Sequence, residues 1–374
     1  MLGSVLDIFR LRQYFNAVTR TRELAAGVFD DVGFLADARR ALLPLPFEGR
    51  DLRAPPLPFP PLDVRPLSRL ADQRVAIAAT GGSGALASVV GVARAFEERA
   101  ISPAAISVCS GSALFGFPLG AGMPADDVAA FVLGLRPRDY VDLDVKGLLG
   151  LPVLAGRGFS GVLRGDAVED TYRGLVGDMR MADLPVPVYA PIWDVDHNRL
   201  VHIGPDTHPD LGVARAVRMS IALPLFIQAV PLDGAWWCDG GIVDIFPVRP
   251  LIERVAPDAV VAVNGFYPPE FGGEDLSGWH ERSLSILYAA AQVRTCQQVE
   301  LARENLARLR RECRVELIEP VPYAKVRGTG FYRQYFDNRE WGSFMAAGRT
   351  AALGALTALA RRTPVPRLES RRAG

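Results

Sequence analysis

The feature that most constrains the fold is a pattern repeated between residues 75 and 122. A short apolar run is followed by small residues and then by a helical pattern. The first run is VAIAA at 75–79, followed by the glycine turn TGGSG and a helical pattern over 85–99. The second is AAISV at 104–108, followed by a helical pattern over 112–122. Strands that are apolar on both faces are typical of parallel sheets covered on both sides. We therefore expect a three-layer α/β/α fold with a mainly parallel central sheet.

Further elements follow the same alternation along the chain. Strands are predicted at 186–193, 199–203, 259–264 and 315–318, and long helices at 283–312 and 340–360. The segment DVDHN at 194–198 lacks the central glycine and the distant glutamate of a calcium loop. It therefore predicts the turn of a hairpin between two of these strands.

The two ends of the chain differ in composition from its middle. Residues 1–43 carry apolar residues at spacings of three and four and predict an amphipathic helical extension. That helix could pack on the main domain or lie on a membrane surface or partner. Residues 44–72 are rich in proline and predict an extended linker or a strap over the surface. Residues 73–360 then form the main domain, and residues 361–374 form a basic tail.

Composition excludes several classes of protein. The 42 basic and 42 acidic residues balance, so the chain has no overall attraction to nucleic acid. Four cysteines are too few for a disulfide scaffold and favour a reduced, cytoplasmic setting. Charges at Asp7, Arg10 and Arg12 interrupt any signal-peptide core. No uncharged apolar run reaches the roughly 20 residues of a membrane span.

Ser110 is a candidate nucleophile because it follows a buried strand and precedes a helix. A tight turn at that point exposes the hydroxyl and places it beside the free N–H groups of the helix start. The nucleophile-elbow pattern G-x-S-x-G is incomplete, however, because this chain reads V-C-S-G-S at 108–112. A serine that merely caps the helix fits the same residues. The residues alone leave both interpretations open.

Asp239 is the second candidate, because it directly precedes Gly240 and Gly241 in the segment 217–248. Two glycines permit a tight turn and would hold the carboxylate at the end of a strand. An ordinary Asp-Gly turn without catalytic function is the alternative.

Taken in order, the glycine turn, the serine turn and the Asp-Gly-Gly segment resemble the patatin-like phospholipases. Members of this family are lipid acyl hydrolases with a serine–aspartate dyad. The segments that carry the resemblance are TGGSGALASVVGVARAFEERAI, PAAISVCSGSALFG, AVRMSIALPLF and DGGIVDIFPV, within residues 73–360. In the family the serine lies seven residues after the proline that opens the strand. Counting from Pro103 reaches Ser110 rather than Ser112, and Ala113-Leu114 then falls in register.

The resemblance implies a complete reaction scheme. Ser110 would attack the acyl ester, and Asp239 would accept its proton without help from a histidine. The oxyanion would be held by backbone N–H groups of the glycine turn: Gly81, Gly82, Ser83 and Gly84. The implied substrate is a phospholipid or related acyl ester, with peripheral association at a membrane or lipid surface. No cofactor is expected, because TGGSG lacks the following G-K-[ST] of a phosphate-binding loop and the histidines lack the spacing of metal ligands.

Three positions depart from the family pattern. Val108 and Ser112 replace the two elbow glycines, and Ala85 stands where the family has an arginine in the oxyanion loop. The same dyad could also serve an acyltransferase or a polyester hydrolase. A noncatalytic lipid-binding or regulatory protein on the same fold is the remaining alternative.

Overall fold

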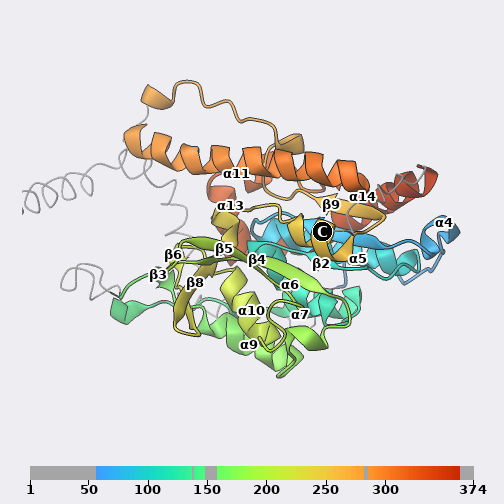
Figure 1. The fold of residues 1–374 in the computed structure, drawn as a ribbon, viewed down its shortest axis with the longest axis horizontal. Helices are drawn as coiled ribbons and strands as arrows, with labels where there is room; N and C mark the ends of the chain where they lie inside the picture. The colour runs from blue at the N-terminus through green and yellow to red at the C-terminus, as the bar shows by residue number, and fades with distance from the viewer. Residues whose placement is uncertain (1–55, 137–138, 148–157, 282–284, 363–374) are drawn as a thin grey trace, which may run out of the picture.

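The central sheet has eight strands in a computed structural model that describes residues 56–136, 139–147, 158–281 and 285–362. Its order is β10-β9-β1-β2-β4-β8-β7, with β5 paired to β4, and a separate two-stranded sheet joins β3 to β6 (Figure 1). The strands are β1 (Val75–Ala79), β2 (Ile106–Ser107), β3 (Gly161–Leu163), β4 (Val188–Asp194), β5 (Arg199–Ile203), β6 (Leu225–Ile227), β7 (Val230–Leu232), β8 (Ala235–Asp239), β9 (Ala259–Val263) and β10 (Arg314–Ile318).

The sheet is parallel over the five strands β10, β9, β1, β2 and β4. It becomes antiparallel where β5 and β8 pair with β4 and where β7 pairs with β8. The prediction of a mainly parallel sheet is therefore confirmed. All five residues of β1 are fully buried, because helices cover both of its faces.

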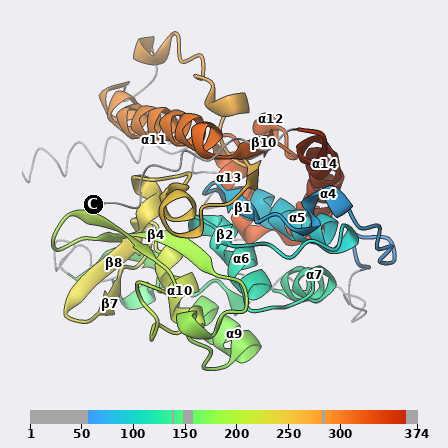
Figure 2. The same cartoon turned by 45° about the vertical axis from the view of Figure 1, so that its right-hand side comes forward.

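Alternate residues of β1 enter two different cores. Val75, Ile77 and Ala79 join one apolar cluster, whereas Ala76 and Ala78 join the other. The first cluster includes helices α5, α6, α7 and α14, and the second includes α11. Figures 1 and 2 show α11 on one side of the sheet and α6 and α7 on the other, which confirms the three-layer architecture.

The helices of the described chain alternate with these strands. They are α4 (Ser68–Ala71), α5 (Ser88–Glu98), α6 (Ala113–Gly120), α7 (Ala125–Gly134), α9 (Asp166–Val176), α10 (Val213–Ser220), α11 (Ser285–Glu312), α12 (Tyr323–Val326), α13 (Thr329–Phe336) and α14 (Trp341–Arg361). None of the described helices is both long enough and apolar enough to span a membrane.

Helices α5 and α14 approach each other through glycines. A Cβ on Gly91 of α5 would collide with the carbonyl oxygen of Met345 in α14. A Cβ on Gly348 of α14 would likewise collide with the carbonyl oxygen of Ser88. The two glycines therefore set the distance between the first and last long helices described.

Most predicted elements are confirmed, with shifts of one or two residues at their ends. The strands at 75–79 and 199–203 match residue for residue, and residues 195–198 form the predicted hairpin turn. The predicted strand at 104–108 is shorter, because β2 pairs only over Ile106 and Ser107. Strands β3, β6 and β7 were not predicted, whereas β8 ends at Asp239, where the sequence predicted a strand end. Each is short, and β3, β6 and β7 have only three residues.

The predicted helical extension at 1–43 lies outside the described residues, as do residues 44–55 and the tail from 363. Residues 56–66 of the proline-rich stretch form no helix or strand and run along α5. The Arg94 guanidinium donates to the carbonyl of Pro60, and the Arg65 N–H donates to the carbonyl of Glu98.

Candidate active site

Ser110 lies at a sharp turn between β2 and α6. It opens a single 3₁₀ turn, Ser110–Ser112, which leads directly into the helix. Its backbone φ is +51°, a left-handed conformation that a residue with a side chain rarely adopts. Such strain persists only where the surroundings enforce it, and it is common at functional sites. The serine is partly exposed, as the sequence predicted for a nucleophile turn.

Ser112, the other candidate at this turn, is engaged elsewhere. Its side chain is fully buried, and its Oγ accepts from the Cys109 N–H at 2.8 Å and donates to the Cys109 carbonyl at 2.9 Å. Both bonds stay within the turn. Ser112 therefore stabilises the 3₁₀ turn before α6 and leaves Ser110 as the accessible hydroxyl of the pair.

Asp239 is the last residue of β8, and the pairing of β8 with β4 places it beside the serine turn. Strand β2 pairs with β4 at Val188 and Tyr189, whereas antiparallel β8 pairs with β4 further on, and Asp239 lies opposite Ile192. The serine turn and the aspartate therefore approach from opposite directions. The Ser110 hydroxyl lies close enough to the Asp239 carboxylate to favour its charged form through hydrogen bonding. Its Oδ1 also accepts from the Gly241 N–H at 2.7 Å, across the predicted Asp-Gly-Gly turn.

Burial dominates the electrostatics of this carboxylate. Asp239 is only 1% exposed, and the loss of solvation raises its pKa from the ordinary value of 3.8 to about 7. The hydrogen bonds from Ser110 and from the Gly241 N–H oppose this rise, because both stabilise the charged form. An aspartate with a pKa near neutrality is a far better proton acceptor than an exposed one.

The glycine turn lies against the serine turn, as predicted. A Cβ on Gly111 would collide with the carbonyl of Gly82, so the two backbones are in direct contact. The N–H of Gly81 donates to the Ile245 carbonyl at 2.8 Å and is already occupied. Within the described part of the chain, no acceptor contacts the N–H groups of Gly82, Ser83, Gly84 or Gly111. The Ser83 hydroxyl is buried, and it too has no hydrogen-bond partner there.

Comparison with known proteins relates this segment to a family. Residues 78–252, which contain both turns and the aspartate, match the family model described as patatin-like phospholipase. This segment of the chain therefore resembles the patatin-like phospholipases. Uncharacterized NTE family proteins of Mycobacterium bovis and Mycobacterium tuberculosis are 31% identical over 193 residues. This alignment covers 51% of the chain and 49% of each relative, so the chain spans about half the length of these relatives.

Three solved structures resemble the chain at low sequence identity. VipD from Legionella pneumophila is 14% identical with a TM-score of 0.40, covering 77% of this chain and 67% of its own. The type III effector protein ExoU is 13% identical with a TM-score of 0.35, covering 79% and 56%. Human GIVD cytosolic phospholipase A2 is 10% identical with a TM-score of 0.33, covering 86% and 66%.

The patatin-like domain accommodates the two missing elbow glycines by packing. Val108 replaces the first, and its Cγ1 occupies the space where a Cβ on Gly116 of α6 would lie. The close approach of strand and helix is therefore made possible by a glycine in the helix instead of one in the strand. Ser112 replaces the second and compensates through its two bonds to Cys109. Ala85, at the position of the family's arginine, is fully buried and offers no charged group to the oxyanion loop.

Cys109, next to Ser110, is a buried packing residue, which is the ordinary role of a small cysteine at such a position. A Cβ on Gly81 would come within 3.0 Å of its Sγ, and a Cβ on Gly241 within 2.6 Å. The thiol thus lies between the glycine turn and the Asp-Gly-Gly turn and keeps them in fixed relation. Its pKa is raised well above the ordinary value, because it is buried beside carboxylates. It is therefore a neutral packing group rather than a nucleophile.

The polar groups after the Asp-Gly-Gly turn pair locally. Asp244 contacts His202 Nε2 at 3.1 Å and accepts from the Asn305 side-chain amide at 3.0 Å. Of the described residues, no group of three or more histidine, cysteine, aspartate or glutamate side chains could hold a metal ion.

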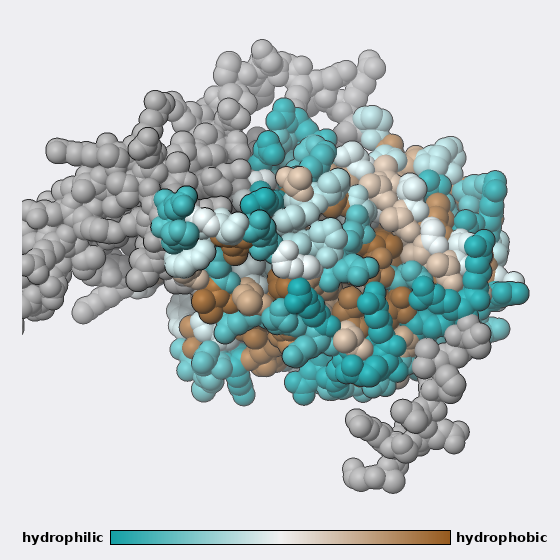
Figure 3. All heavy atoms as spheres, turned by 90° about the horizontal axis from the view of Figure 1, so that it is seen from above, coloured by the Kyte–Doolittle hydropathy of each residue, from teal (hydrophilic) through white to brown (hydrophobic). Residues whose placement is uncertain are grey.

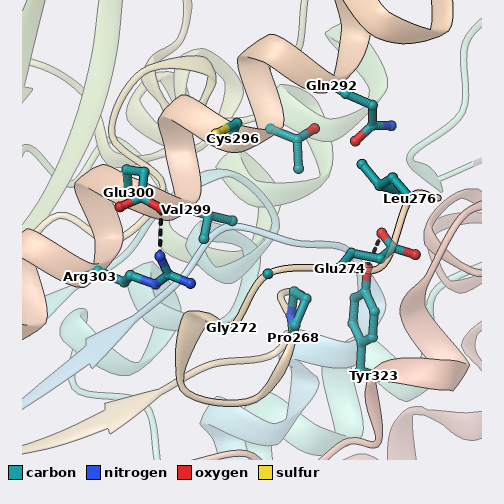
Figure 4. A pocket seen from close by; sticks show the side chains of 12 residues that line it. Pro268, Gly272, Glu274, Leu276, Gln292, Cys296, Val299, Glu300, Arg303 and Tyr323 are labelled. Atoms are coloured by element: carbon teal, nitrogen blue, oxygen red, sulfur yellow. Dashed lines mark hydrogen bonds and ion pairs between the residues drawn. The ribbon is translucent and has the colours of Figure 1, made fainter. Parts of the chain in front are cut away.

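A separate pocket of about 160 Å³ lies between α11 and the segment 268–276 (Figure 4). Cys296 and Val299 line it from the helix, and Tyr323 lines it from the start of α12. Its polar groups are paired: Glu274 accepts from the Tyr323 hydroxyl, and Arg303 contacts Glu300. Neither Ser110 nor Asp239 is among the residues that line it.

Proposed function

We propose that this protein is a lipid acyl hydrolase that cleaves acyl ester bonds of phospholipids or related lipids. Ser110 is the nucleophile and Asp239 is the base. The observation that carries this proposal is that a serine with strained backbone lies beside a buried carboxylate, whose pKa is raised to about 7 and which the serine hydroxyl helps to keep charged. The match of residues 78–252 to the patatin-like phospholipase family supports the choice of lipid substrates.

The proposed reaction has two steps. Ser110 Oγ attacks the acyl carbonyl while its proton passes to Asp239, and the protonated aspartate then gives this proton to the leaving alkoxide. An acyl-serine and a free alcohol result. Water then attacks the acyl-serine, with Asp239 again accepting a proton and returning it to Ser110 Oγ. The fatty acid leaves, and the enzyme is restored.

The developing oxyanion needs donors beside Ser110. The N–H groups of Gly82, Ser83, Gly84 and Gly111 are suitable, because no described group accepts from them. Gly111 follows the nucleophile, which is the position that supplies an oxyanion donor in nucleophile elbows. We omit Gly81 from this set, because its N–H is bonded to Ile245. Each donor of this kind is worth about 3 kcal/mol of barrier.

Association with a lipid surface is part of the proposal. Large apolar side chains are exposed on the described chain, including Val243 four residues after Asp239, Trp236 on β8 and Leu225, which is 81% exposed. On the face shown in Figure 3, apolar residues gather in patches between polar ones. The sequence of residues 1–43 predicts an amphipathic helix, which would add further apolar area.

A fluorophosphonate probe tests the proposal without knowledge of the natural substrate. The probe reacts covalently with activated serines, and mass spectrometry of the labelled chain identifies the residue. We expect labelling at Ser110 and its loss in Asp239→Asn. The Ser110→Ala variant should reduce ester hydrolysis on the order of 10³-fold or more, because it removes the nucleophile itself.

Ser112→Ala is the matched control for this experiment. It removes a hydroxyl two residues away that is bonded only within the turn, so labelling at Ser110 should persist. Labelling of Ser112 in the wild type would contradict the assignment. A folded, vesicle-binding protein that is not labelled would instead favour a noncatalytic lipid-binding role, consistent with the alanine at position 85.

A further inference from the structure

One buried side chain outside the dyad is linked to it by hydrogen bonds. Gln298, on α11, is only 9% exposed, and its amide bridges two segments of the chain. Its Nε2 donates to the carbonyl of Gly241, and its Oε1 accepts from the Tyr267 hydroxyl at 3.1 Å. The N–H of the same glycine donates to Asp239 Oδ1. A continuous chain of hydrogen bonds thus runs from Tyr267 through Gln298 and Gly241 to Asp239.

The chemistry of these groups fixes the direction of each bond. A backbone carbonyl can only accept, so the NH₂ of the Gln298 amide must face Gly241. The amide oxygen therefore faces Tyr267, whose hydroxyl donates. Burial raises the pKa of Tyr267 well above its ordinary range, so this hydroxyl keeps its proton throughout the working pH range.

The Gly240-Gly241 turn needs such a tether because neither residue has a side chain to restrict it. Residues beyond the turn are held separately: the Gly81 N–H binds the Ile245 carbonyl, and Asn305 binds Asp244 and Phe246. In the described chain, Gln298 is the side chain that holds the Gly241 carbonyl. The peptide that carries the Gly241 N–H is held at the Gly240 carbonyl by the N–H groups of Val243 and Asp244. Gln298 holds the next peptide, so Gly241 is fixed on both sides.

We propose that Gln298 is a positioning residue for the Ser110–Asp239 dyad, acting through the backbone of Gly241. This inference rests on the proposed function. When Gln298 holds the carbonyl of that glycine, it restricts rotation of the Gly241 backbone, so that the N–H stays directed at the carboxylate and keeps Asp239 oriented toward Ser110. Gln298 itself touches no reacting atom. It also lies on the helix that borders the pocket of Figure 4, between the pocket-lining residues Cys296 and Val299.

The test compares Gln298→Leu with the wild type across pH. The hydrogen bond from the Gly241 N–H lowers the pKa of Asp239. Loss of the Gln298 side chain should weaken this bond, and the pKa of Asp239 should therefore rise. The pH midpoint of fluorophosphonate labelling should therefore move upward by about half a unit or more. In ester hydrolysis kcat should fall about tenfold, with KM within about twofold, because only the geometry of the base changes.

Gln298→Glu separates the two hydrogen bonds of the Gln298 side chain, one with Tyr267 and one with Gly241. Its carboxylate can still accept from Tyr267 but cannot donate to Gly241, so it should behave like Gln298→Leu. Asn338→Leu is the structural control, because it also removes a side-chain amide that donates to a backbone carbonyl, that of Leu135 after α7. This control should lower the melting temperature without moving the pH midpoint.

A second measurement does not depend on catalysis. The difference in unfolding free energy between proteins with and without Asp239→Asn reports the pKa of Asp239, because only the carboxylate titrates. The other ionisable groups that face Asp239, Cys109, Cys238 and Tyr267, all have raised pKa values and remain neutral. The pH at which this difference stops growing should be higher in the Gln298→Leu background.

If the pH at which this difference stops growing is the same in the Gln298→Leu background, the positioning role is overturned, whether or not Ser110 is labelled. A higher pH in a protein that the probe never labels would support the role of Gln298 but reject the proposed hydrolase activity. The two hypotheses therefore fail separately.

Discussion

At the scale of single residues, the buried carboxylate of Asp239 sets function against stability. A carboxylate that is useful as a base near neutral pH must be kept from water, and its charge is then poorly solvated. Between the ordinary pKa of 3.8 and the folded pKa of about 7, the carboxyl group of Asp239 therefore keeps its proton in the native state and loses it in the unfolded chain. The same burial that raises the basicity of Asp239 costs folding free energy once the group ionises.

We expect Asp239→Asn to be inactive yet more stable than the wild type at neutral pH. The folded pKa of about 7 lies above the ordinary 3.8, so the stability that this group contributes is fully present below about pH 4. It is lost as the pH rises through 7. The neutral amide avoids this loss, and the variant should gain roughly 2–4 kcal/mol over the wild type by pH 8.

Denaturant unfolding of both proteins at several pH values between 5 and 9 would measure the gain. It should grow between pH 5 and 7 and then level off. A difference that is the same at every pH would show that Asp239 does not titrate as described.

The sequence pointed to some of these residues and not to others. Ser110 and Asp239 could be located because small residues and glycines mark their turns, and the structure brings the two together. The hydrogen bond from the Gly81 N–H could not be foreseen, because its acceptor, the carbonyl of Ile245, is distant in sequence. Gln298 was missed for the same reason: its contacts depend on how the loop after β8 packs against α11.

At the scale of elements, α5 and α14 depend on each other at a backbone-to-backbone crossing. Gly91 and Gly348 are each in contact with the other helix, where any side chain would meet backbone atoms rather than a flexible group. Backbone cannot move aside as a side-chain tip can, so the helices would have to separate. Because the glycine turn and the short 3₁₀ turn Gly84–Ala87 lead directly into α5, that separation would also disturb the candidate oxyanion loop.

We expect Gly348→Val to destabilise the protein by about 3 kcal/mol or more through overpacking, with loss of labelling at Ser110. Gly354→Ala on the same helix is the control, because nothing lies within 4 Å of the added methyl group. Alanine favours a helix over glycine by about 1 kcal/mol, so this variant should be slightly more stable. Thermal unfolding of both would decide. A well-folded, fully labelled Gly348→Val would contradict the described crossing.

Element prediction succeeded where a segment carries its own periodicity. The strands at 75–79 and 259–264 and the long helices were found because each buries an apolar pattern that spans the element. Strands β6, β7 and β8 follow one another within fifteen residues. β6 pairs with the distant β3 and β8 with the distant β4, whereas β7 forms a local hairpin with β8. No local periodicity marks such short pieces.

At the scale of the whole molecule, the proposed lipid substrate lies in a membrane or another lipid surface, to which the enzyme must bind. We expect deletion of residues 1–43 to reduce co-sedimentation with phospholipid vesicles severalfold, because an amphipathic segment contributes apolar area at the lipid surface. Labelling of Ser110 by a soluble probe should be unchanged. Equal vesicle binding by both forms would assign the association to the exposed apolar side chains of the main domain instead.

The family match ends at residue 252, but the described fold does not. Strands β9 and β10 continue the sheet beyond β1, and α14 covers the helix that follows the glycine turn. The matched segment therefore lacks a sheet edge and part of one layer.

This arrangement has a consequence for synthesis on the ribosome. Strand β1 is made well before its partner β9 and before α14, the helix that crosses α5. Until then, the apolar faces of the N-terminal half are uncovered and the loop beside Ser110 has no support from α14. Contacts between segments so far apart in sequence form slowly, because a long loop must first close. The nascent chain should therefore depend on chaperones, and reactivity of Ser110 would report that its folding is complete.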